Sequence, residues 1–568
     1  MAPVTRWIRR HLQRPLLVLL AICTLAAIPR VYLATTWPLN YDEYWHVFVA
    51  RQDTRAAFSS EWRHTAHPPL YYWLLKLSLA VGWNRLVYRL VSLLAGLAAV
   101  LVVWVIGRRL ARDRAVPWLA ALAFALAVPA IVTSFDVRAY MLSAVCALGS
   151  FACLLAMLDD RAPRGITGFS VLACLAVLSS YSAAFFVLAA LAGLVYASAI
   201  ALARDGRLPA IVRERPVALA LGLLLPALTM AGLYRTHARG FAERQAQMSH
   251  VPAFQYQPDL ESVGAYLVRS VHNEINLFLP APLGDAMALP LFALTVAAVG
   301  GAAIWLGRRR GDVLRRLPML LVLLMASALL VASVRGVYPF GGRLRQQFVL
   351  FPFLVVAWFQ LVDAAMVRWP AWRRPLGAAG LAAVCLSGAW HLADDSRPTR
   401  GELCRRQMAL YRTAFGTPPA VYTDAFSAIV LFAHHDRWDW RAAPAATRGA
   451  RPDRYVMSKD GQQVVVWRQD RPLDLADERT YRTVGEKLRS SGLPSTAVFA
   501  VRYAGHTYGA GGSSTSSYCQ NSPGPPAADA DESELRRRMA ALAAGQRLEI
   551  GQLILDGPDV FGELRASP

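Results

Sequence analysis

Charged residues are scarce in this sequence. They make up 17% of its 568 residues, whereas hydrophobic residues make up 55%. A soluble protein usually carries about 25% charged residues. The shortage of charge therefore argues against an ordinary soluble protein and predicts one that lies in a membrane.

Acidic residues are the rarer of the two charged kinds. The 38 Asp and Glu residues stand against 60 Lys and Arg residues, which gives a formal charge of +22. In a soluble protein this excess would point to nucleic acid. In a membrane protein it has another meaning, because short cytoplasmic loops collect basic residues. We therefore predict membrane lipids as partners and no nucleic acid.

The sequence also lacks features that would support other interpretations. No convincing small-x-small cleavage site follows the first apolar run, and the next loop has the character of a functional one, so we interpret this run as a membrane span and not as a signal peptide. No sequence repeat is apparent, whereas many transporters are built from inverted repeats. Of the seven cysteines, only Cys404 and Cys519 lie outside apolar runs, and whether they form a disulfide stays open.

Long apolar runs dominate the first two-thirds of the chain. An α-helix needs about 20 apolar residues to cross the hydrocarbon core of a bilayer. We therefore predict a polytopic α-helical membrane protein with about eleven transmembrane helices. They are expected at residues 15–34, 86–106, 116–134, 139–158, 166–179, 183–203, 217–235, 287–306, 317–334, 347–365 and 376–392.

Arginine residues mark alternate ends of these predicted helices. Because basic residues collect in cytoplasmic loops, we place the N-terminus in the cytoplasm. Composition and the family resemblance described below imply that the membrane is a bacterial inner membrane. The opposite, periplasmic or extracellular face then holds the large outer loops 35–85 and 236–286. We predict a transmembrane domain at 1–392 and an extracytoplasmic domain at 393–568.

The C-terminal region differs in character from the rest of the chain. Short β-like runs at 464–467 and 496–501 alternate with helical patterns at 476–490 and 531–545. This alternation is typical of a small soluble α/β domain.

Two adjacent carboxylates, Asp42 and Glu43, follow the first predicted span. One can act as a general base on an acceptor hydroxyl or amine, and the other can hold a metal ion or an acceptor group. The alternative is a solvated acidic loop. The aromatic neighbours Tyr41, Tyr44 and Trp45 argue against free solvation, although aromatic residues also anchor proteins at membrane interfaces.

Further along the same loop, His67 precedes Pro68, Pro69 and a run of apolar and aromatic residues. Proline fits the first turn of a helix, so we predict that a helix lying in the membrane interface starts here. His67 would then lie at the depth of a lipid phosphate. The alternative is a structural turn that contains a histidine by chance.

The second outer loop is short and holds Asp136, Arg138 and Tyr140. An acid and a base at the mouth of two membrane helices are costly unless they are used. We therefore treat Asp136 as a candidate catalytic residue, and Arg138 and Tyr140 as candidates for binding substrate. The alternative is that Asp136 and Arg138 only pair with each other.

A later outer loop carries Arg343 and Arg345 on the face that should be poor in arginine. The planar guanidinium group matches phosphate oxygens, and the preceding pair Gly341-Gly342 lets the backbone approach a ligand closely. These features favour a phosphate site. The alternative is anchoring to lipid headgroups.

Residues suited to a divalent metal ion are scattered. Glu43, His272 and Glu274 are candidates, although His272 and Glu274 do not share a helix face. The His-His-Asp run at 434–436 has the composition of a metal site, but we interpret it as a surface cluster. The sequence therefore leaves a divalent metal cofactor open.

Taken in order, these motifs resemble the GT-C glycosyltransferases. They are most similar to the bacterial branch related to protein O-mannosyltransferases and to the aminoarabinose transferase of lipid A. The resemblance covers about residues 10–392. It rests on the acidic pair at 42–43, His-Pro-Pro-Leu-Tyr-Tyr at 67–72, Asp-x-Arg-x-Tyr at 136–140, Ser-Tyr at 180–181 and Gly-Gly-Arg at 341–343.

The resemblance implies an inverting transfer of a sugar from a polyprenyl-phosphate donor to an extracytoplasmic protein, glycan or lipid. It implies Asp42 as the catalytic base, Glu43 or Asp136 as its acidic partner, and His67 beside the lipid phosphate. In the lipid A branch, a Glu just before the position of His67 helps to bind a metal ion. Here that residue is Ala66, which leaves both metal dependence and a lipid A acceptor open.

The chemistry of such a donor agrees with these residues. Phosphate is already a good leaving group, so the second carboxylic acid that glycosidases use is not required. One base and one cationic phosphate site suffice if the reactants are well placed. Arg138, Arg343 and Arg345 are the candidates for neutralising the phosphate.

Two other interpretations compete with the enzyme. A transporter or flippase of a lipid-linked or small polar substrate would also need many helices and buried charges. Transporters tend to keep those charges near mid-membrane, whereas the candidate residues here cluster at the ends of outer loops. A scaffold whose C-terminal domain binds a partner would be expected to lose the pattern around Asp42, which this sequence retains.

Overall fold

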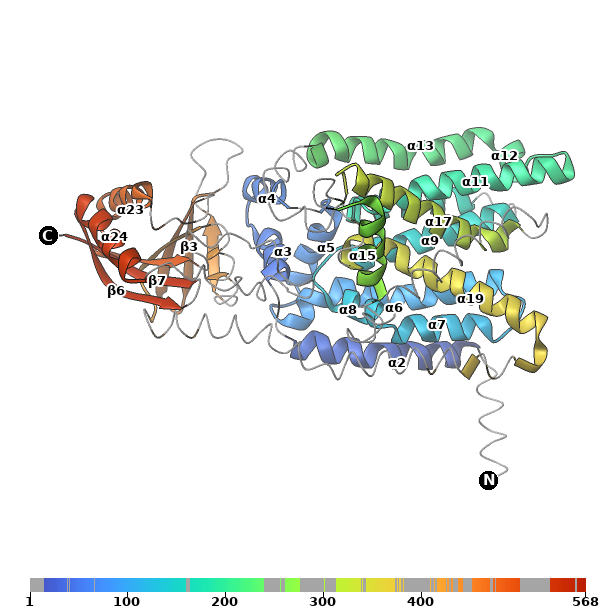
Figure 1. The fold of residues 1–568 in the computed structure, drawn as a ribbon, viewed down its shortest axis with the longest axis horizontal. Coiled ribbons are helices and arrows are strands. Elements are labelled where there is room, and N and C mark those ends of the chain that lie inside the picture. The colour runs from blue at the N-terminus through green and yellow to red at the C-terminus, as the bar shows by residue number, and fades with distance from the viewer. Residues whose placement is uncertain are drawn as a thin grey trace, which may run out of the picture. The chain divides into compact units, whose positions relative to one another are not determined.

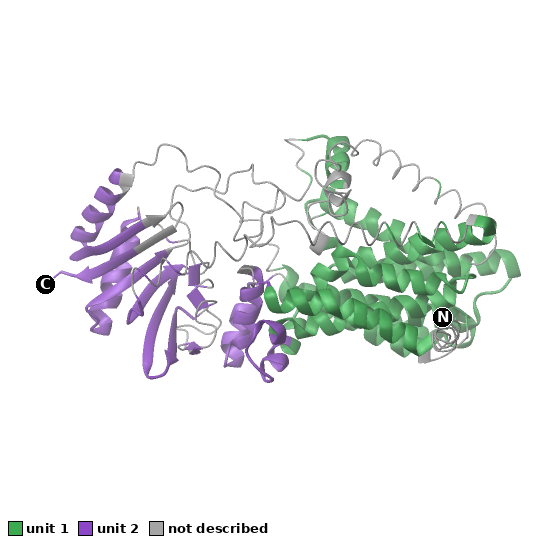
Figure 2. Cartoon of the chain, turned by 90° about the horizontal axis from the view of Figure 1, so that it is seen from below, with its two compact units in different colours: residues 1–36, 66–74, 88–394 green, residues 37–65, 75–87, 395–568 purple. Residues whose placement is uncertain are grey.

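Two compact units make up the chain in the computed structural model (Figures 1 and 2). The membrane unit comprises residues 1–36, 66–74 and 88–394, and the sheet unit comprises residues 37–65, 75–87 and 395–568. Apart from scattered single positions, the structure describes residues 15–37, 41–65, 67–159, 164–239, 261–275, 313–338, 344–372, 416–424, 438–442, 452–469, 477–500, 532–556 and 559–567.

Apolar helices of transmembrane length build the membrane unit. Within the described residues, seven helices are long and apolar enough to cross a membrane, or eight if one bent pair forms a single span. They are α2 (Pro15–Thr36), α6 (Arg85–Leu110), α9 (Tyr140–Asp159), α11 (Ala183–Asp205), α13 (Pro216–Leu233) with the π-helix η1 (Tyr234–Ala238), α17 (Val313–Val334), and α19 (Phe351–Arg368) with the 3-10 turn η3 (Phe348–Leu350).

The bent pair is α7 (Val116–Leu126) and α8 (Val128–Phe135), which meet at an angle of 55°. The shorter apolar helix α10 (Arg164–Ser179) follows α9. Described helices therefore coincide with every predicted span except 287–306 and 376–392, which lie outside the described residues. The other helical pieces that the structure describes in this unit are α12 (Ala210–Glu214), α15 (Val263–Ile275), α18 (Leu344–Gln347) and η4 (Pro370–Trp372).

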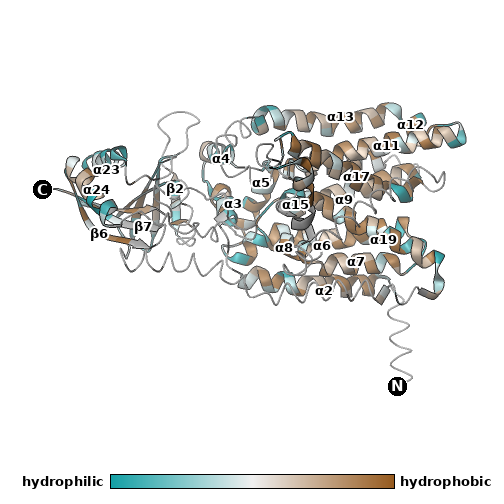
Figure 3. Cartoon of the chain, in the orientation of Figure 1, coloured by the Kyte–Doolittle hydropathy of each residue, from teal (hydrophilic) through white to brown (hydrophobic). Residues whose placement is uncertain are grey.

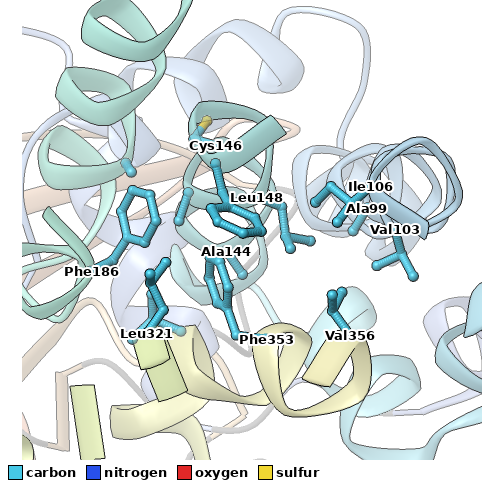
Figure 4. Close-up of a cluster of buried hydrophobic side chains, with 14 of the residues drawn as sticks. Ala99, Val103, Ile106, Ala144, Cys146, Leu148, Phe186, Leu321, Phe353 and Val356 are labelled. Atoms are coloured by element: carbon cyan, nitrogen blue, oxygen red, sulfur yellow. The ribbon is translucent and has the colours of Figure 1, made fainter. Parts of the chain in front are cut away.

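Close packing of α9, α11, α17 and α19 forms the centre of the membrane unit (Figure 4). The rings of Phe186 and Phe353 stack with centroids 5.3 Å apart, and Phe151 meets Phe353 edge-on at 5.6 Å. Other large apolar side chains on these helices face outward, such as Leu188 and Trp358. Hydrophobic residues thus cover both sides of the helices (Figure 3), as expected for a bundle that lipid surrounds.

A seven-stranded mixed sheet forms the C-terminal part of the sheet unit, with strand order β2-β3-β4-β1-β5-β7-β6. The strands are β1 (Ala420–Asp424), β2 (Asp439–Ala442), β3 (Arg454–Lys459), β4 (Gln462–Gln469), β5 (Ser495–Ala500), β6 (Leu548–Asp556) and β7 (Asp559–Ala566). The central strand β1 pairs in parallel with β4 and β5, and the outer pairs are antiparallel.

Within the described part of this domain, the helices α23 (Glu478–Ser491) and α24 (Glu532–Gly545) pack against the sheet. Helix α23 begins where Asp477 accepts a hydrogen bond from the amide of Arg479, and it ends at Gly492 in the left-handed conformation, as N-cap and C-cap preferences predict. Strand β4 covers the predicted run 464–467, and β5, α23 and α24 coincide with the described parts of the other predicted elements, which confirms the expected α/β domain.

Part of the first predicted outer loop belongs to the sheet unit. It folds into α3 (Tyr41–Arg51) and α4 (Arg55–Trp62), followed by α5 (Leu70–Leu79). The side chain of Thr54 caps α4 by accepting a hydrogen bond from the amide of Ala57. Helix α5 begins directly after Pro69, which confirms the helix start predicted from the proline pair.

Candidate functional site

The turn between α8 and α9 places an acid and a base side by side. The amide of Arg138 donates a hydrogen bond of 2.8 Å to the carbonyl of Asp136, and the guanidinium Nε lies 3.6 Å from the Asp136 carboxylate. Arg138 is buried and Asp136 is half-buried. The pairing that the sequence offered as the simpler alternative is therefore present, and Asp136 keeps some access to solvent.

His67 lies against the same turn. Its ring meets the ring of Tyr140 edge-on with centroids 5.0 Å apart, and both side chains are buried. Tyr140 is the first residue of α9. The structure thus gathers His67, Asp136, Arg138 and Tyr140, all predicted site residues, around one short segment of the membrane unit.

A chain of hydrogen bonds holds this segment in place. The hydroxyls of Tyr71 on α5 and Ser92 on α6 lie 3.1 Å apart, and Ser92 donates to the carbonyl of Arg138 at 3.1 Å. All three residues are buried. The start of α5, which follows His67, is therefore fixed to the turn that carries Asp136 and Arg138.

Two buried arginines that sequence reasoning missed contact the end of α8. Arg89 on α6 donates to the carbonyls of Leu33 and Ala34 at the end of α2, and its guanidinium lies 5.4 Å from the ring centroid of Phe135. Cations are favourable at a helix C-terminus, where carbonyls lack helical donors. Arg30 on α2 donates to the hydroxyl of Ser134 at 3.1 Å.

The signal for Arg30 and Arg89 was present in the sequence, since a charged residue inside an apolar run is costly unless it has partners. Each lies within a predicted span and not in a loop. Together with Arg138, they bring three buried guanidinium groups to the segment 134–138.

Aromatic residues extend the site along the membrane unit. Tyr338 donates to the carbonyl of Gln346 at 2.9 Å and meets Phe185 edge-on at 5.4 Å. Burial, with the nearby Tyr140 as a smaller contribution, raises the pKa of Tyr338 above its usual range, so its hydroxyl stays neutral. Tyr181 hydrogen-bonds His237 in the π-helix η1, and their rings stack. π-helical turns often occur at functional sites.

Asp42 and Glu43 occupy the first turn of α3, in the sheet unit. Negative charge is favourable there because the first amides of a helix lack acceptors. The side chain of Asp42 is half-buried and that of Glu43 is buried. One turn further on, Nδ1 of His46 lies 2.6 Å from the carbonyl oxygen of Asp42, so it donates a hydrogen bond to the backbone of the candidate base.

Several predicted residues fall outside the described part of the chain. Among the residues that the structure does not describe are Arg343, the run 434–436, Cys404 and Cys519. The side chains of His272, Glu274 and Arg345 are not described either. Within the part that the structure describes, no group of three or more His, Cys, Asp or Glu side chains lies together as a metal site would require. Glu43 is the one metal candidate whose side chain is described.

Comparison with known families bears directly on this site. Residues 66–208 match the model of a family described as dolichyl-phosphate-mannose-protein mannosyltransferase. The match includes His67, Asp136, Arg138 and Tyr140. A comparison with curated proteins finds no match.

Solved structures of ArnT and of an archaeal oligosaccharyltransferase are similar to this chain. ArnT from Cupriavidus metallidurans in the apo state is 12% identical, with a TM-score of 0.50 over 96% of this chain and 97% of that one. The same protein bound to undecaprenyl phosphate gives 12% identity and a TM-score of 0.46 over the same shares. The oligosaccharyltransferase AglB from Archaeoglobus fulgidus, in complex with an inhibitory peptide and a dolichol-phosphate, gives 12% identity and 0.45 over 87% and 70%.

The family match and the shared fold confirm the predicted resemblance to the GT-C glycosyltransferases. They also confirm the predicted fold class, a polytopic helical membrane protein with a C-terminal α/β domain. Together they support a multi-pass membrane protein that shares the fold of ArnT and that is similar, over residues 66–208, to the mannosyltransferase family.

Proposed function

We propose that this protein transfers a sugar from a polyprenyl-phosphate donor to a protein, glycan or lipid acceptor on the extracytoplasmic face of a bacterial inner membrane. The observation that carries the proposal is the contact of His67 and Tyr140 beside the Asp136–Arg138 pair, inside the interval that matches the mannosyltransferase family. The description of that family names a lipid-phosphate sugar, dolichyl-phosphate-mannose. Imidazole and guanidinium side chains can bind the phosphate of such a donor.

In the proposed reaction, Asp42 accepts the proton of the acceptor hydroxyl. The acceptor oxygen forms a bond to the anomeric carbon while the bond from that carbon to the phosphate oxygen breaks, so the configuration inverts. The electron pair of the broken bond leaves on the polyprenyl phosphate. Arg138, with His67 beside it, stabilises the added negative charge, and Arg343 and Arg345 are further candidates for this role.

The burial of Arg138 makes it effective in this role. A cation held in a site of low dielectric stabilises developing charge more strongly than one in water. Its partner Asp136 is half-buried, and it is proposed as the acidic partner of Asp42 alongside Glu43. The hydrogen bonds through Tyr71 and Ser92 keep the turn preorganised before substrate binds.

The one cofactor that we propose is a divalent metal ion. Its candidate ligand in the part of the chain that the structure describes is Glu43. A carboxylate suits such an ion. Transfer that is lost on chelation and returns on adding Mg²⁺ or Mn²⁺ supports this assignment, and transfer that is indifferent to the chelator contradicts it.

The decisive experiment measures transfer of labelled sugar from a polyprenyl-phosphate donor pool in membranes that carry equal amounts of wild type, Asp42→Asn or Asp53→Asn. Asp53 is an exposed aspartate just beyond the same helix α3, so it controls for loss of a negative charge there. We expect transfer by wild type and Asp53→Asn and none by Asp42→Asn. If Asp42→Asn transfers sugar as well as wild type, Asp42 is not the base, and Glu43 or Asp136 would be assigned this role.

Movement of the labelled lipid across the membrane without any transfer would instead support the flippase. Reconstituted vesicles separate the two outcomes, because a flippase changes the accessibility of the donor lipid and leaves its glycosidic bond intact.

A further inference from the structure

A buried ion pair lies inside the sheet unit, between the inserted helices and the C-terminal sheet. Nη2 of Arg468 on β4 lies 2.6 Å from Oε1 of Glu61 on α4, although the two residues are 407 positions apart in the sequence. Neither side chain is exposed. The hydroxyl of Tyr455 on β3 donates to the same carboxylate oxygen at 3.0 Å. The pair therefore joins two segments that only the fold brings together.

The same guanidinium group also contacts the helix that carries Asp42. Arg468 lies 5.7 Å from the ring centroid of Phe48 and 5.2 Å from that of Tyr455. Phe48 in turn packs on Tyr455 and on Phe432, with centroids 5.6 Å and 4.9 Å apart. Asp42 precedes Phe48 by six residues on α3, which is roughly 9 Å along a helix.

The last turn of α3 has a second attachment to the sheet unit. Nη2 of Arg51 donates to the carbonyl of Trp438, next to β2, at 2.8 Å, and its guanidinium lies 3.8 Å from the ring centroid of Trp83. Helix α3 has only 11 residues, and isolated helices shorter than about 12–15 residues are marginal in water. Its position must therefore come from contacts such as these.

Stability alone does not explain a buried ion pair at this place. Replacing a buried pair by apolar residues of similar volume is often neutral or stabilising, because the desolvation cost offsets the attraction between the charges. A pair of fixed geometry does determine how the segments that carry it are oriented.

We infer that Arg468 is a positioning residue for the transfer reaction: through Glu61 and Phe48 it fixes α3, and with it the carboxylate of Asp42. This role rests on the proposed function of Asp42. It makes the C-terminal sheet part of the machinery that orients the base.

The test uses the full-length protein in nanodiscs and compares Arg468→Met with the control Asp424→Asn. Asp424 is also a buried acceptor of the sheet unit, with described hydrogen bonds from Ser427 and Leu473. Hydrogen exchange of the amides of 41–51 is measured together with kcat and KM for the donor lipid. We expect Arg468→Met to raise exchange in α3 at least tenfold and to lower kcat at least tenfold, with KM changed by less than threefold.

Asp424→Asn should leave both α3 exchange and kcat per folded molecule within a factor of two of wild type. If Arg468→Met does not fold, Arg468→Lys and Tyr455→Phe replace it. Arg468→Lys keeps the charge but loses the planar group, so both measurements should fall between wild type and Arg468→Met. Tyr455→Phe removes one hydrogen bond to Glu61, and it should raise α3 exchange by a smaller factor.

If the amides of α3 exchange hydrogen at the wild-type rate in a folded Arg468 variant, the inference is wrong. It is also wrong if their exchange becomes faster while kcat stays unchanged. Hydrogen exchange needs no catalysis, so this result is separable from the proposed function. If Asp42→Asn remains active, the assignment of the base fails while the exchange experiment still decides whether Arg468 fixes α3.

Discussion

The guanidinium of Arg30 donates a hydrogen bond of 2.6 Å to the carbonyl oxygen of Ala125, the carbonyl that Pro129 leaves without its helical donor. In a continuous helix, the amide of residue 129 would bond to the carbonyl of residue 125, but proline has no N–H. Helix α7 ends at Leu126, and α8 leaves at 55°. Within a bilayer, a carbonyl freed in this way needs a partner from a neighbouring element, and Arg30 provides it.

Substituting Arg30 should therefore destabilise the membrane unit. Arg30→Met removes the donors to Ala125 and Ser134, and we expect a loss of about 2 kcal/mol in the free energy of unfolding. Thermal unfolding of the full-length protein in detergent measures it. Leu25→Met, at an outward-facing position of the same helix, is the control and should unfold like wild type. Equal unfolding of both variants would mean that the bend does not need Arg30.

The close approach of α6 to α8 predicts a second effect. A Cβ atom added at Gly96 would clash with the hydroxyl oxygen of Ser134, so Gly96→Ala should displace Ser134 and cost about 1–3 kcal/mol. Gly232→Ala on α13 is the matched control, because no described atom lies within 4 Å of its added Cβ. There, the gain in helix propensity should leave stability unchanged or raise it by up to about 1 kcal/mol. Similar unfolding temperatures for the two variants would contradict the prediction.

The contact between His67 and Tyr140 predicts a graded loss of donor use. His67→Ala should raise the KM for the polyprenyl-phosphate donor about tenfold, because it removes a polar group from the proposed phosphate site. Tyr140→Phe keeps the ring that contacts His67, so it should have a smaller effect than Tyr140→Ala. Initial rates at varied donor concentration measure these changes. A larger loss for Tyr140→Phe than for Tyr140→Ala would show that the ring contact is not what matters.

Arg138 and Asp136 should respond differently to neutralisation. Arg138→Gln removes the proposed phosphate cation and leaves Asp136 without that partner. We therefore expect KM for the donor to rise at least tenfold and kcat to fall, because the leaving phosphate loses a stabilising charge. Asp136→Asn leaves the guanidinium in place and should spare KM. A fall in kcat for Asp136→Asn would identify it as the acidic partner of Asp42, whereas unchanged kcat would assign that partnership to Glu43. Donor titrations with both variants separate these outcomes.

Features that depend on neighbouring residues could be predicted from the sequence. Helices such as α2 and α17 follow from apolar length alone, because a chain in lipid must satisfy its own backbone hydrogen bonds. The start of α5 follows from Pro68 and Pro69, and the Asp136–Arg138 pair from a spacing of two. The strands β4 and β5 follow from β-branched and aromatic runs.

Features that depend on distant residues could not be predicted. Nothing local in α4 shows that Glu61 meets Arg468, or that residues 37–65 belong with the C-terminal sheet. The contact of Arg30 with Ala125 depends on how α2 packs against the bend between α7 and α8. His67 and Tyr140 were each predicted as site residues, but their contact is a property of the packed helices. The assigned roles of Asp42, His67 and Arg138 stay predictions.

The division of the chain between its two units has a consequence for biosynthesis. The ribosome makes Glu61 long before it makes Arg468, which follows 407 residues later. At about 5–20 residues per second, the delay is roughly 20–80 s. During that time, α3 and α4 exist without the strands on which they later pack. A nascent chain that stops before β4 therefore exposes a carboxylate and an aromatic surface meant for burial, which gives quality-control proteases a means to recognise incomplete copies.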